Sequence, residues 1–554
     1  MKKKRIYLSA LALLCTGALF AQGEMDAFRF SHLDLNGSAR SMSMGGAFGA
    51  LGGDMSAMSH NPAGIGVYRS SEVQATVGLN MSTMSSSWTG INTDKKRTNF
   101  NFDNFSYVGY FPTGKDVGIK SWNIGFAYNK VKDFNREYRA VGSNLTSLAD
   151  YVASQASHGV YKGNVGLPEA ALQDENAYFD RDLGGYWLSI IGSDGPGAGF
   201  FGNMYDQADG VYHSAFGDWN QNKTKWTTYR PNETVLNISE RGSINEYNFS
   251  LATNVSDRIF IGATFGIEDI DYRMSSYHDE YFDYEGNDGK AYTDELKLDN
   301  AIETEGTGYS FNLGVIVRPI DMLRLGVAYN SPKWYRMTDY YYATAETYIN
   351  GYDEPEMWDE TPSNQSAEYK LRTPGRWIFS AAGVFGTSAL VSIDYELTDY
   401  KSMNLADRNG EEYVDNDLIK EDFTFGHTVK IGGEYKVTPQ FAVRAGYIWQ
   451  PSPMKNVLTS NNRNDLNVIP AVGTIPHYSV LKSTNHITVG LGYRFTPNFY
   501  ADIACIYRIQ KQKLYPFSNM FYEEPEYHLE EVVSTPANVD AKTTRVALTL
   551  GYKF

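Results

Sequence analysis

Regular alternation of apolar and polar residues is the sequence feature that most limits how this chain folds. At the C-terminus, Leu548, Leu550, Tyr552 and Phe554 share one face, and small or polar residues occupy the positions between them. Successive residues of a strand point to opposite faces, so this period of two predicts a strand with one apolar and one polar face. An apolar face that ends in an aromatic pair suits lipid, with the rings at the membrane interface. The segment therefore predicts a membrane-spanning strand.

The same phase recurs in earlier segments, among them 441–449, 487–495 and 499–507. In these segments Arg444 and Asp502 fall on the face opposite the apolar residues. A cationic side chain that faces lipid at mid-bilayer costs about 2–4 kcal/mol. The polar face must therefore line the interior of the protein.

Segments with this alternation occur about fourteen times from residue 70 onward. They lie near 70–85, 100–111, 120–136, 243–254, 258–275, 306–318, 322–342, 366–384, 388–402, 423–437, 440–450, 480–495, 498–512 and 541–554. Very short connections, such as 437–440 and 496–498, alternate with long ones, which is typical of periplasmic turns and extracellular loops. A closed barrel leaves no exposed strand edges and pairs every backbone group within lipid. We therefore predict an all-β fold, a transmembrane antiparallel barrel of about 14 strands over residues 70–554.

The longest connection, residues 137–242, is far beyond an ordinary loop, and we expect an extracellular insertion with structure of its own. Spacing of apolar residues predicts a helix near 144–157, with Asn144 or Ser147 as its cap. Aromatic residues of this insertion are candidates for ligand contact, although they also fit a small loop core. They are Tyr186, Trp187, Phe200 and Phe201.

The N-terminus predicts export. Four basic residues precede an apolar run from Ile6 to Phe20 that is too short to span a membrane, followed by Ala21. We read residues 1–21 as a cleaved signal peptide and expect a location in the outer membrane of a Gram-negative bacterium. A lipoprotein site at Cys15 is disfavoured because Leu14 stands where a small residue is needed. Cleavage would leave Cys505 as the remaining cysteine, so no intrachain disulfide is expected.

Charge and motif searches exclude several function classes. The chain has 49 basic and 65 acidic residues and a net charge of −16, which argues against nucleic acid as a partner. The nine histidines show no metal-ligand spacing, and the acidic clusters near 279–288 and 407–412 lack EF-hand spacing, so no metal site is expected. Residues 197–202 fit a glycine-rich dinucleotide pattern, but no buried strand precedes them. We expect no cofactor and no enzymatic activity.

The segment between the signal peptide and the first strand, residues 22–69, has a different character. It contains GSARSMSMGGAF at 37–48 and NPAG at 61–64. Glycines such as Gly45 and Gly46 permit close backbone approach and positive φ, and Pro62 interrupts any helix. Such a segment can pack inside a barrel.

These residues strongly resemble the N-terminal hatch of the FadL-type outer-membrane transporters (OMPP1/FadL/TodX-like), and the type found in Bacteroidetes in particular. Passages 306–314, 325–332 and 444–453 add to the resemblance. The resemblance implies a lumen plugged by the hatch, in which Ser59 and His60 depart from the aromatic residues frequent in relatives. The plug and gating residues that it implies are Asn61, Pro62, Ala63, Gly64, Gly45 and Gly46.

The resemblance also implies a function. It predicts passive uptake of hydrophobic small molecules, such as long-chain fatty acids, which displace the hatch and leave through a wall opening at the third strand. The corresponding strand here is about 119–138 and contains Gly125, although a lone strand glycine is more often a packing accommodation. The C-terminal alternation that ends in Phe554 matches the signal read by the barrel-assembly machinery, so that machinery, outer-membrane lipid and lipopolysaccharide are expected partners.

Two other function classes stay open. Barrels that resemble this family serve as interaction or shuttle components of an outer-membrane protein-secretion system in the Bacteroidetes, and long outer loops would suit docking. An outer-membrane hydrolase with a Ser-His-Asp/Glu site near the rim is a weaker alternative, because the members of such a triad meet in space and not in sequence order.

Overall fold

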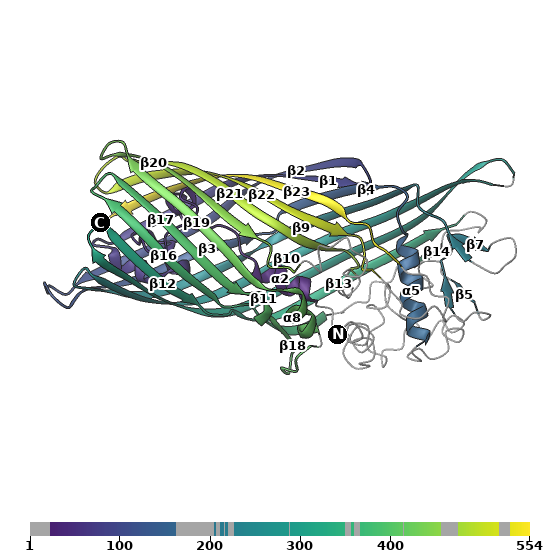
Figure 1. The fold of residues 1–554 in the computed structure, drawn as a ribbon, viewed down its shortest axis with the longest axis horizontal. Coiled ribbons are helices and arrows are strands. Elements are labelled where there is room, and N and C mark those ends of the chain that lie inside the picture. The colour runs from purple at the N-terminus through teal and green to yellow at the C-terminus, as the bar shows by residue number, and fades with distance from the viewer. Residues whose placement is uncertain are drawn as a thin grey trace.

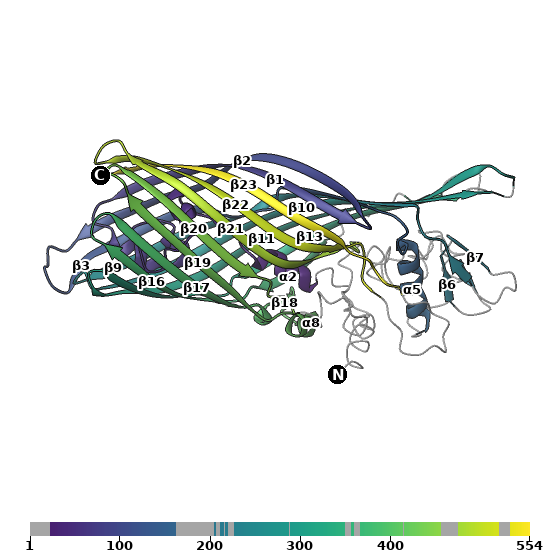
Figure 2. The same cartoon turned by 45° about the horizontal axis from the view of Figure 1, so that its top comes forward.

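Fourteen antiparallel strands form a closed barrel in the computed structural model (Figures 1 and 2). The structure describes residues 23–161, 204–206, 211–214, 216–219, 226–286, 288–349, 356–358, 366–413, 415–455, 475–519 and 532–554, so the predicted signal peptide lies outside it. Neighbouring strands pair in chain order, and the ring closes where β1 (Glu72–Trp88) pairs with β23 (Ala537–Lys553). The predicted fold class is confirmed.

Some of the fourteen strands consist of two consecutive segments. The strands between β1 and β23 are β2 (Ile91–Pro112), β3 (Ile119–Asp133) continued by β4 (Arg136–Gly142), β9 (Glu233–Val255), β10 (Ile259–Glu285), β11 (Ala291–Ile320), β12 (Leu323–Asn330) continued by β13 (Trp334–Tyr348), β15 (Ser366–Arg372) continued by β16 (Arg376–Phe385), β17 (Ala389–Asp399) continued by β18 (Asn404–Asp407), β19 (Phe425–Lys436), β20 (Phe441–Pro451), β21 (Tyr478–Arg494) and β22 (Phe499–Tyr515).

Side-chain exposure alternates along the strands as the sequence predicts. In β23, Leu548 and Leu550 are 40% and 47% exposed on the outer face, whereas Ala547 and Thr549 are fully buried on the inner face. Aromatic side chains on the outer face form two belts: Tyr309 stacks on Trp334 toward one end, and Phe495 stacks on Phe499 toward the other. An apolar band between two aromatic belts is typical of a barrel wall that faces a bilayer.

The two ends of the barrel differ. Short turns such as 256–258 and 437–440 lie at the end that contains Phe554, which we name the turn end. The opposite end, the loop end, carries α5 (Leu148–Tyr161), η5 (Tyr400–Ser402), α8 (Asp415–Asp422) and the short strands β5 (Met204–Asp206), β6 (Val211–His213), β7 (Gly217–Trp219), β8 (Trp226–Thr228) and β14 (Glu356–Trp358). None of the helices that the structure describes is both long and apolar enough to span a membrane.

Several strands extend further at the loop end than the alternation indicated. β9 begins at Glu233, inside the expected insertion, and β10 and β11 continue as a hairpin that projects from the barrel (Figure 1). Above the bilayer the outer face of these strands carries polar residues such as Arg241 and Asp271, so the apolar stripe that identified the strands ends there. The helix α5 begins four residues later than expected, and Ser147 caps it by accepting a hydrogen bond from the Ala149 amide at 3.0 Å.

An outward-facing charge provides a test of this architecture. We expect Leu548→Arg to lower the free energy of unfolding by about 2–4 kcal/mol, because the guanidinium would face lipid near mid-bilayer. Asn538→Arg, an exposed position of the same strand at the loop end, is the matched control and should have little effect. Equal losses for both variants in urea unfolding from lipid vesicles would contradict the assigned lipid face.

Candidate functional site

The N-terminal segment lies inside the barrel and runs round its inner wall (Figure 1). It comprises α2 (Glu24–Ser31), α3 (Ala39–Ser43), α4 (Ala57–His60) and η1 (Pro62–Val67) and enters β1 directly afterwards. From Ala39 to Tyr68 it contacts in turn β23 and β22, then β20 and β19, then β16 and β12, and finally β11, β10, β9 and β3. We keep the name hatch for this segment, because it occupies the lumen across its width.

Glycines of the wall receive the hatch backbone at close range. At each of these positions a Cβ atom would overlap a hatch atom: the Met44 carbonyl at Gly432, Pro62 at Gly262 and the Gly49 carbonyl at Gly326. The same holds at Gly314, Gly446 and Gly490. Any other residue would push the hatch away from the wall, so the inward glycines of the alternating strands form its seat.

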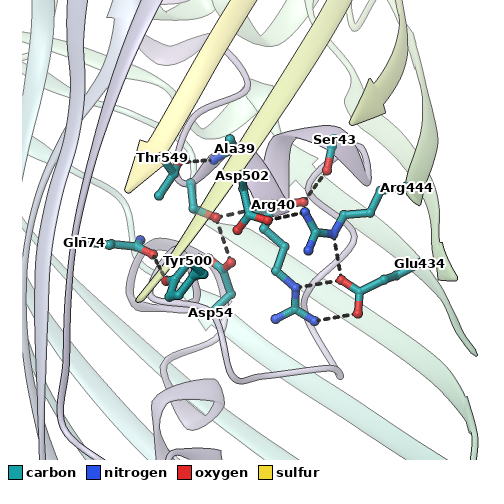
Figure 3. Close-up of polar contacts among 12 residues, drawn as sticks. Ala39, Arg40, Ser43, Asp54, Gln74, Glu434, Arg444, Tyr500, Asp502 and Thr549 are labelled. Carbon is teal, nitrogen blue, oxygen red and sulfur yellow. Dashed lines mark hydrogen bonds and ion pairs between the residues drawn. The ribbon is translucent and has the colours of Figure 1, made fainter. Parts of the chain in front are cut away.

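A buried ionic network joins the hatch to the wall near the turn end (Figure 3). Arg40 of the hatch pairs with Glu434 of β19 at 2.9 Å, and Glu434 also pairs with Arg444 of β20 at 2.7 Å. Arg444 in turn pairs with Asp502 of β22 at 2.6 Å. Burial opposes the charged form of Arg40, but Glu434 and Asp54 outweigh it and raise its pKa, so the guanidinium stays charged. Removing one member of a buried pair costs about 3–5 kcal/mol, so the network resists displacement of α3.

A second anchor lies where the barrel closes. The Ala39 amide donates to Thr549 Oγ1 at 2.7 Å, and Thr549 Oγ1 lies 2.7 Å from Thr76 Oγ1 of β1. Nearby, Ser38 Oγ donates to Asp54 Oδ2 at 2.7 Å, which ties the two halves of the hatch together. The hatch is therefore bonded to the last strand at the residue that also bonds the first strand.

The plug residues implied by the resemblance lie at two places on the wall. Asn61 Nδ2 donates to the Gly49 carbonyl at 2.6 Å, and Asn61 Oδ1 accepts from the Ala63 amide at 3.2 Å, which fixes the turn into η1 against β10 and β11. Gly45 and Gly46 adopt positive φ of 64° and 69° beside β19 and β20. The structure does not bring the two groups together, and their role in gating stays a prediction.

Two residues that depart from the resemblance have defined surroundings. Ser59 Oγ donates to Glu246 at 2.7 Å and accepts from Asn248 at 2.9 Å, so a polar contact holds α4 against β9. His60 is 6% exposed, and among the described residues neither of its ring nitrogens has a hydrogen-bond partner. Burial and the nearby charge of Lys430 lower the pKa of His60 to about 3, so the imidazole is neutral.

Toward the loop end the hatch contacts are largely apolar, although Arg29 of α2 also lies 4.0 Å from Glu240 of β9 and its carbonyl accepts a hydrogen bond from Lys132 Nζ at 3.0 Å. Phe28 of α2 stacks on Phe423 with ring centroids 5.4 Å apart, and Phe30 meets the edge of Tyr272 at 5.7 Å. These residues belong to a large buried cluster that fills the upper lumen. Because α2 makes these contacts through side chains and not through backbone seated on wall glycines, it is held differently from α3 and η1.

Two of the cavities beside the hatch lie in the middle and upper lumen. The central cavity, of about 110 Å³, is lined by His60, Arg376 and Lys430, and by apolar groups such as Phe30 and Ile448. The side cavity, of about 60 Å³, is lined mainly by residues of β1, β2, β3, β22 and β23. Asp34, Leu35 and His486 line both cavities, so the two meet at this part of the hatch.

The side cavity reaches an interruption in the wall, which we name the β2–β3 seam. The β2–β3 ladder ends at the pair Asn104–Asn129, whereas β2 continues to pair with β1 as far as Ile91. Beyond this point side chains bridge the strands: Asp133 Oδ2 accepts hydrogen bonds from Asn80, Asn99 and Asn101 at 2.7–2.9 Å. Both rims of the seam line the side cavity.

Sequence reasoning found some parts of this arrangement and missed others. The inward phase of Arg444 and Asp502 was visible, but their link to Arg40 through Glu434 was not, since no sequence pattern pairs these positions. Gly125 of β3 faces Met58 and Ile65, where a Cβ would crowd the Met58 sulfur, so it accommodates packing. Tyr186, Trp187, Phe200 and Phe201 lie outside the described residues.

The C-terminal assembly signal remains a prediction. Leu548, Leu550 and Tyr552 face outward, and Phe554 is 60% exposed at the turn end. The Phe554 ring stacks against Tyr107 and Tyr552, and its amide donates to the Ser71 carbonyl at 3.0 Å. The terminal residue is therefore placed where a soluble partner at the turn end can reach it.

A closed membrane barrel with an internal plug and cavities that reach its wall defines a plugged β-barrel channel. The model of the outer membrane protein transport family (OMPP1/FadL/TodX) matches residues 222–554, and the chain belongs to this family. Barrels of this family reside in the outer membrane of Gram-negative bacteria and are channels for hydrophobic compounds, not enzymes. No curated protein sequence matches the chain.

Solved structures similar to this chain share little sequence with it. A FadL homologue of Pseudomonas aeruginosa is 13% identical, with 95% of this chain and 100% of that chain covered and a TM-score of 0.49. The toluene transporter TodX of Pseudomonas putida is 12% identical, with 94% and 99% covered and a TM-score of 0.45. The toluene transporter TbuX of Ralstonia pickettii is 12% identical, with 94% and 98% covered and a TM-score of 0.43.

The glycine seat can be tested by adding a side chain to the wall. Gly446→Val would overlap the hatch backbone at Met44 and Gly45, and such overpacking costs about 1–3 kcal/mol or displaces the hatch. We expect increased ion conductance of the purified protein in planar bilayers. Gly433→Val, at a neighbouring position with open surroundings, is the matched control. Unchanged conductance and unchanged unfolding free energy for Gly446→Val would refute the seat.

Proposed function

We propose that this chain is an outer-membrane channel for the passive uptake of hydrophobic small molecules, such as long-chain fatty acids. Membership of the OMPP1/FadL/TodX family supports this function. The observation that carries it is the hatch, which is seated against the wall round its inner circumference while cavities beside it reach the wall. A solute that crosses the membrane must therefore pass around the hatch or displace its less firmly seated part.

The seating of the hatch indicates which part moves. The segment from Ala39 to Val67 is held by wall glycines and by the Arg40 network, whereas α2 is held mainly by apolar side chains, with one long ion pair from Arg29 to Glu240 at 4.0 Å. An apolar solute can replace apolar contacts at little cost, but it cannot replace buried ion pairs. We therefore propose that α2 and the residues after it as far as Leu35 yield to the solute, and that the part of the hatch from Ala39 onward stays in place.

The β2–β3 seam is the proposed way out, in line with the third-strand opening that the family resemblance implies. Across the seam the strands are held by side chains and not by a backbone ladder: by the hydrogen bonds to Asp133, by Lys130 to Asn101 at 3.1 Å and by the Arg97–Glu137 ion pair at 3.0 Å. Side chains can separate without breaking the strands, which makes this the weakest section of the wall beside the side cavity. Export through the signal peptide, assembly at Phe554 and contact with lipid and lipopolysaccharide belong to the same proposal.

A barrel that serves protein secretion is less well supported. Such a component would be expected to have an empty, polar lumen under its outer loops. Here the hatch fills the lumen, and an apolar cluster occupies its loop half. The family assignment favours the channel as well.

Uptake by a strain that lacks this protein, with and without the chain restored, tests the proposed function. We expect the restored strain to take up radiolabelled oleate or toluene faster than the deletion strain. Unchanged uptake of both compounds, together with no binding of either to the purified protein, would refute the channel. Co-purification with secretion proteins in that case would favour the alternative.

Loosening the seam tests the exit. Asp133→Ala removes the acceptor of three side-chain hydrogen bonds, and a loss of about 1 kcal/mol would enlarge the open population about fivefold. We therefore expect faster uptake of whichever of the two compounds the wild-type chain carries. Asp269→Ala, an exposed outer-face carboxylate of β10, is the control. Slower or unchanged uptake by a folded Asp133→Ala variant would exclude the seam as the exit.

A further inference from the structure

A second interruption of the wall lies on a different part of the barrel, between β19 and β20. Their ladder runs from Lys436–Ala442 to Val429–Trp449, and pairing resumes only at the isolated bridge between Phe423 and Met454. Within the part of the chain that the structure describes, residues 425–428 of β19 have no ladder partners in residues 450–453, which comprise the end of β20 and the two residues after it. We name this section the β19–β20 seam.

Proline explains the interruption. Pro451 and Pro453 have no amide hydrogen, so neither can donate a ladder bond to β19. The amide of Ser452, between them, donates to the Lys482 carbonyl on the other side of β20. Two backbone bonds close the far end of the seam, from the Thr424 amide to the Pro453 carbonyl and from the Lys455 amide to the Asp422 carbonyl, both at 2.8 Å. The prolines at the end of β20 and just beyond it therefore cause the interruption of the ladder.

The central cavity reaches both rims of this seam. Its lining includes Gly426, His427 and Thr428 of β19, and on the other rim Gln450 and Pro451 of β20 and Pro453 just beyond it. These are the residues that lack ladder partners across the seam. The cavity therefore extends from His60 at the hatch to the wall at the place where the backbone ladder is missing.

The lipid-facing side of the seam lies at the aromatic belt toward the loop end of the barrel. Phe425 and Trp449 are 38% and 47% exposed beside the rims, and the His427 ring accepts or donates a 2.7 Å hydrogen bond with the Tyr395 hydroxyl. Aromatic residues of this kind mark the interface between hydrocarbon and head groups. A lipid-soluble molecule that accumulates at this depth lies directly outside the seam.

We propose that the β19–β20 seam is a lateral portal through which lipid-soluble molecules pass between the outer leaflet and the central cavity. The portal rests on the proposed function and adds to it a side access distinct from the β2–β3 seam. The cavity behind it combines apolar groups, such as Phe30 and Ile448, with the neutral imidazole of His60 and the Lys430–Glu396 ion pair. Such a lining suits an amphipathic molecule with a polar end.

The portal defines a route across the barrel. The central and side cavities meet at Asp34, Leu35 and His486, and the side cavity ends at the β2–β3 seam. The junction is held by Arg508, which pairs with Asp34 at 2.6 Å. Although burial alone would raise the pKa of Asp34, Arg508 and Lys132 hold it below its usual range, so the carboxylate is charged while the hatch is seated. A solute that crosses here needs the segment around Leu35 to move, whereas the seat of α3 and η1 stays intact.

A reversible cross-link tests the portal. In a Cys505→Ala background, Thr428→Cys with Gln450→Cys places two thiols opposite each other, one step beyond the last ladder pair. Oxidation should close the seam and lower the uptake of oleate and toluene about tenfold, because a disulfide holds the two Cα atoms within about 7 Å. Uptake should recover on reduction with a phosphine.

A cross-link within the paired section is the matched control. Lys436→Cys with Ala442→Cys lies on the same two strands, at the same phase of the ladder, and should leave uptake unchanged in both redox states. Equal uptake by the oxidised and reduced seam variants would overturn the portal. A loss that reduction does not reverse would also count against it, because the effect would then come from the substitutions.

A labelling experiment separates the portal from the transport function. With Cys505→Ala and His60→Cys, N-dodecylmaleimide in the bilayer of proteoliposomes should label the cavity thiol. Pro451→Val with Pro453→Val restores both amide donors and should slow labelling, whereas Pro439→Val, in the turn between the same strands, should not. If the Pro451→Val/Pro453→Val variant is labelled more slowly but the protein takes up neither oleate nor toluene, the portal is supported and the transport function is refuted. Labelling that is equally fast in all variants would refute the portal.

Discussion

The lumen of a fourteen-strand barrel is too wide for its own side chains to fill, and this constraint shapes the rest of the structure. Barrels of about eight strands pack their interiors with side chains, whereas barrels of sixteen or more leave a water-filled channel. Here a separate segment of chain fills the space. It lies so close to the wall that glycine is needed at Gly262, Gly326, Gly432 and other inward positions. The strands therefore carry small inward residues where the hatch packs against them.

Much of the barrel was predictable because lipid imposes a strict rule on the outer face. Where a strand crosses the bilayer, residues such as Leu548 and Leu550 must be apolar, and the alternation reveals the strand. Above the bilayer the outer face of a strand need not be apolar. The alternation therefore did not predict the start of β9 at Glu233 or the long β10–β11 hairpin. The β19–β20 seam had a visible signal in Pro451 and Pro453, but its meaning depends on the cavity behind it.

The sequence motif predicted only some of the contacts that hold the hatch. The pattern around Asn61 indicates a plug, and its side chain does secure the turn into η1. The strongest anchor, however, joins Arg40 to Glu434, far apart in sequence, and only the closed barrel brings them together. In the central cavity most charges are likewise matched: Lys430 pairs with Glu396 at 2.6 Å and Lys333 with Glu246 at 2.8 Å. A solute there meets polar groups that present little net charge.

The bond from the Ala39 amide to Thr549, which also touches Thr76, has a consequence for the closure of the barrel. β1 and β23 are the first and last strands, and their pairing turns the curved sheet into a ring. Because the hatch binds at that junction and precedes β1 directly, seating it and closing the ring stabilise each other. The segment that plugs the barrel thus also strengthens the junction at which the ring is joined.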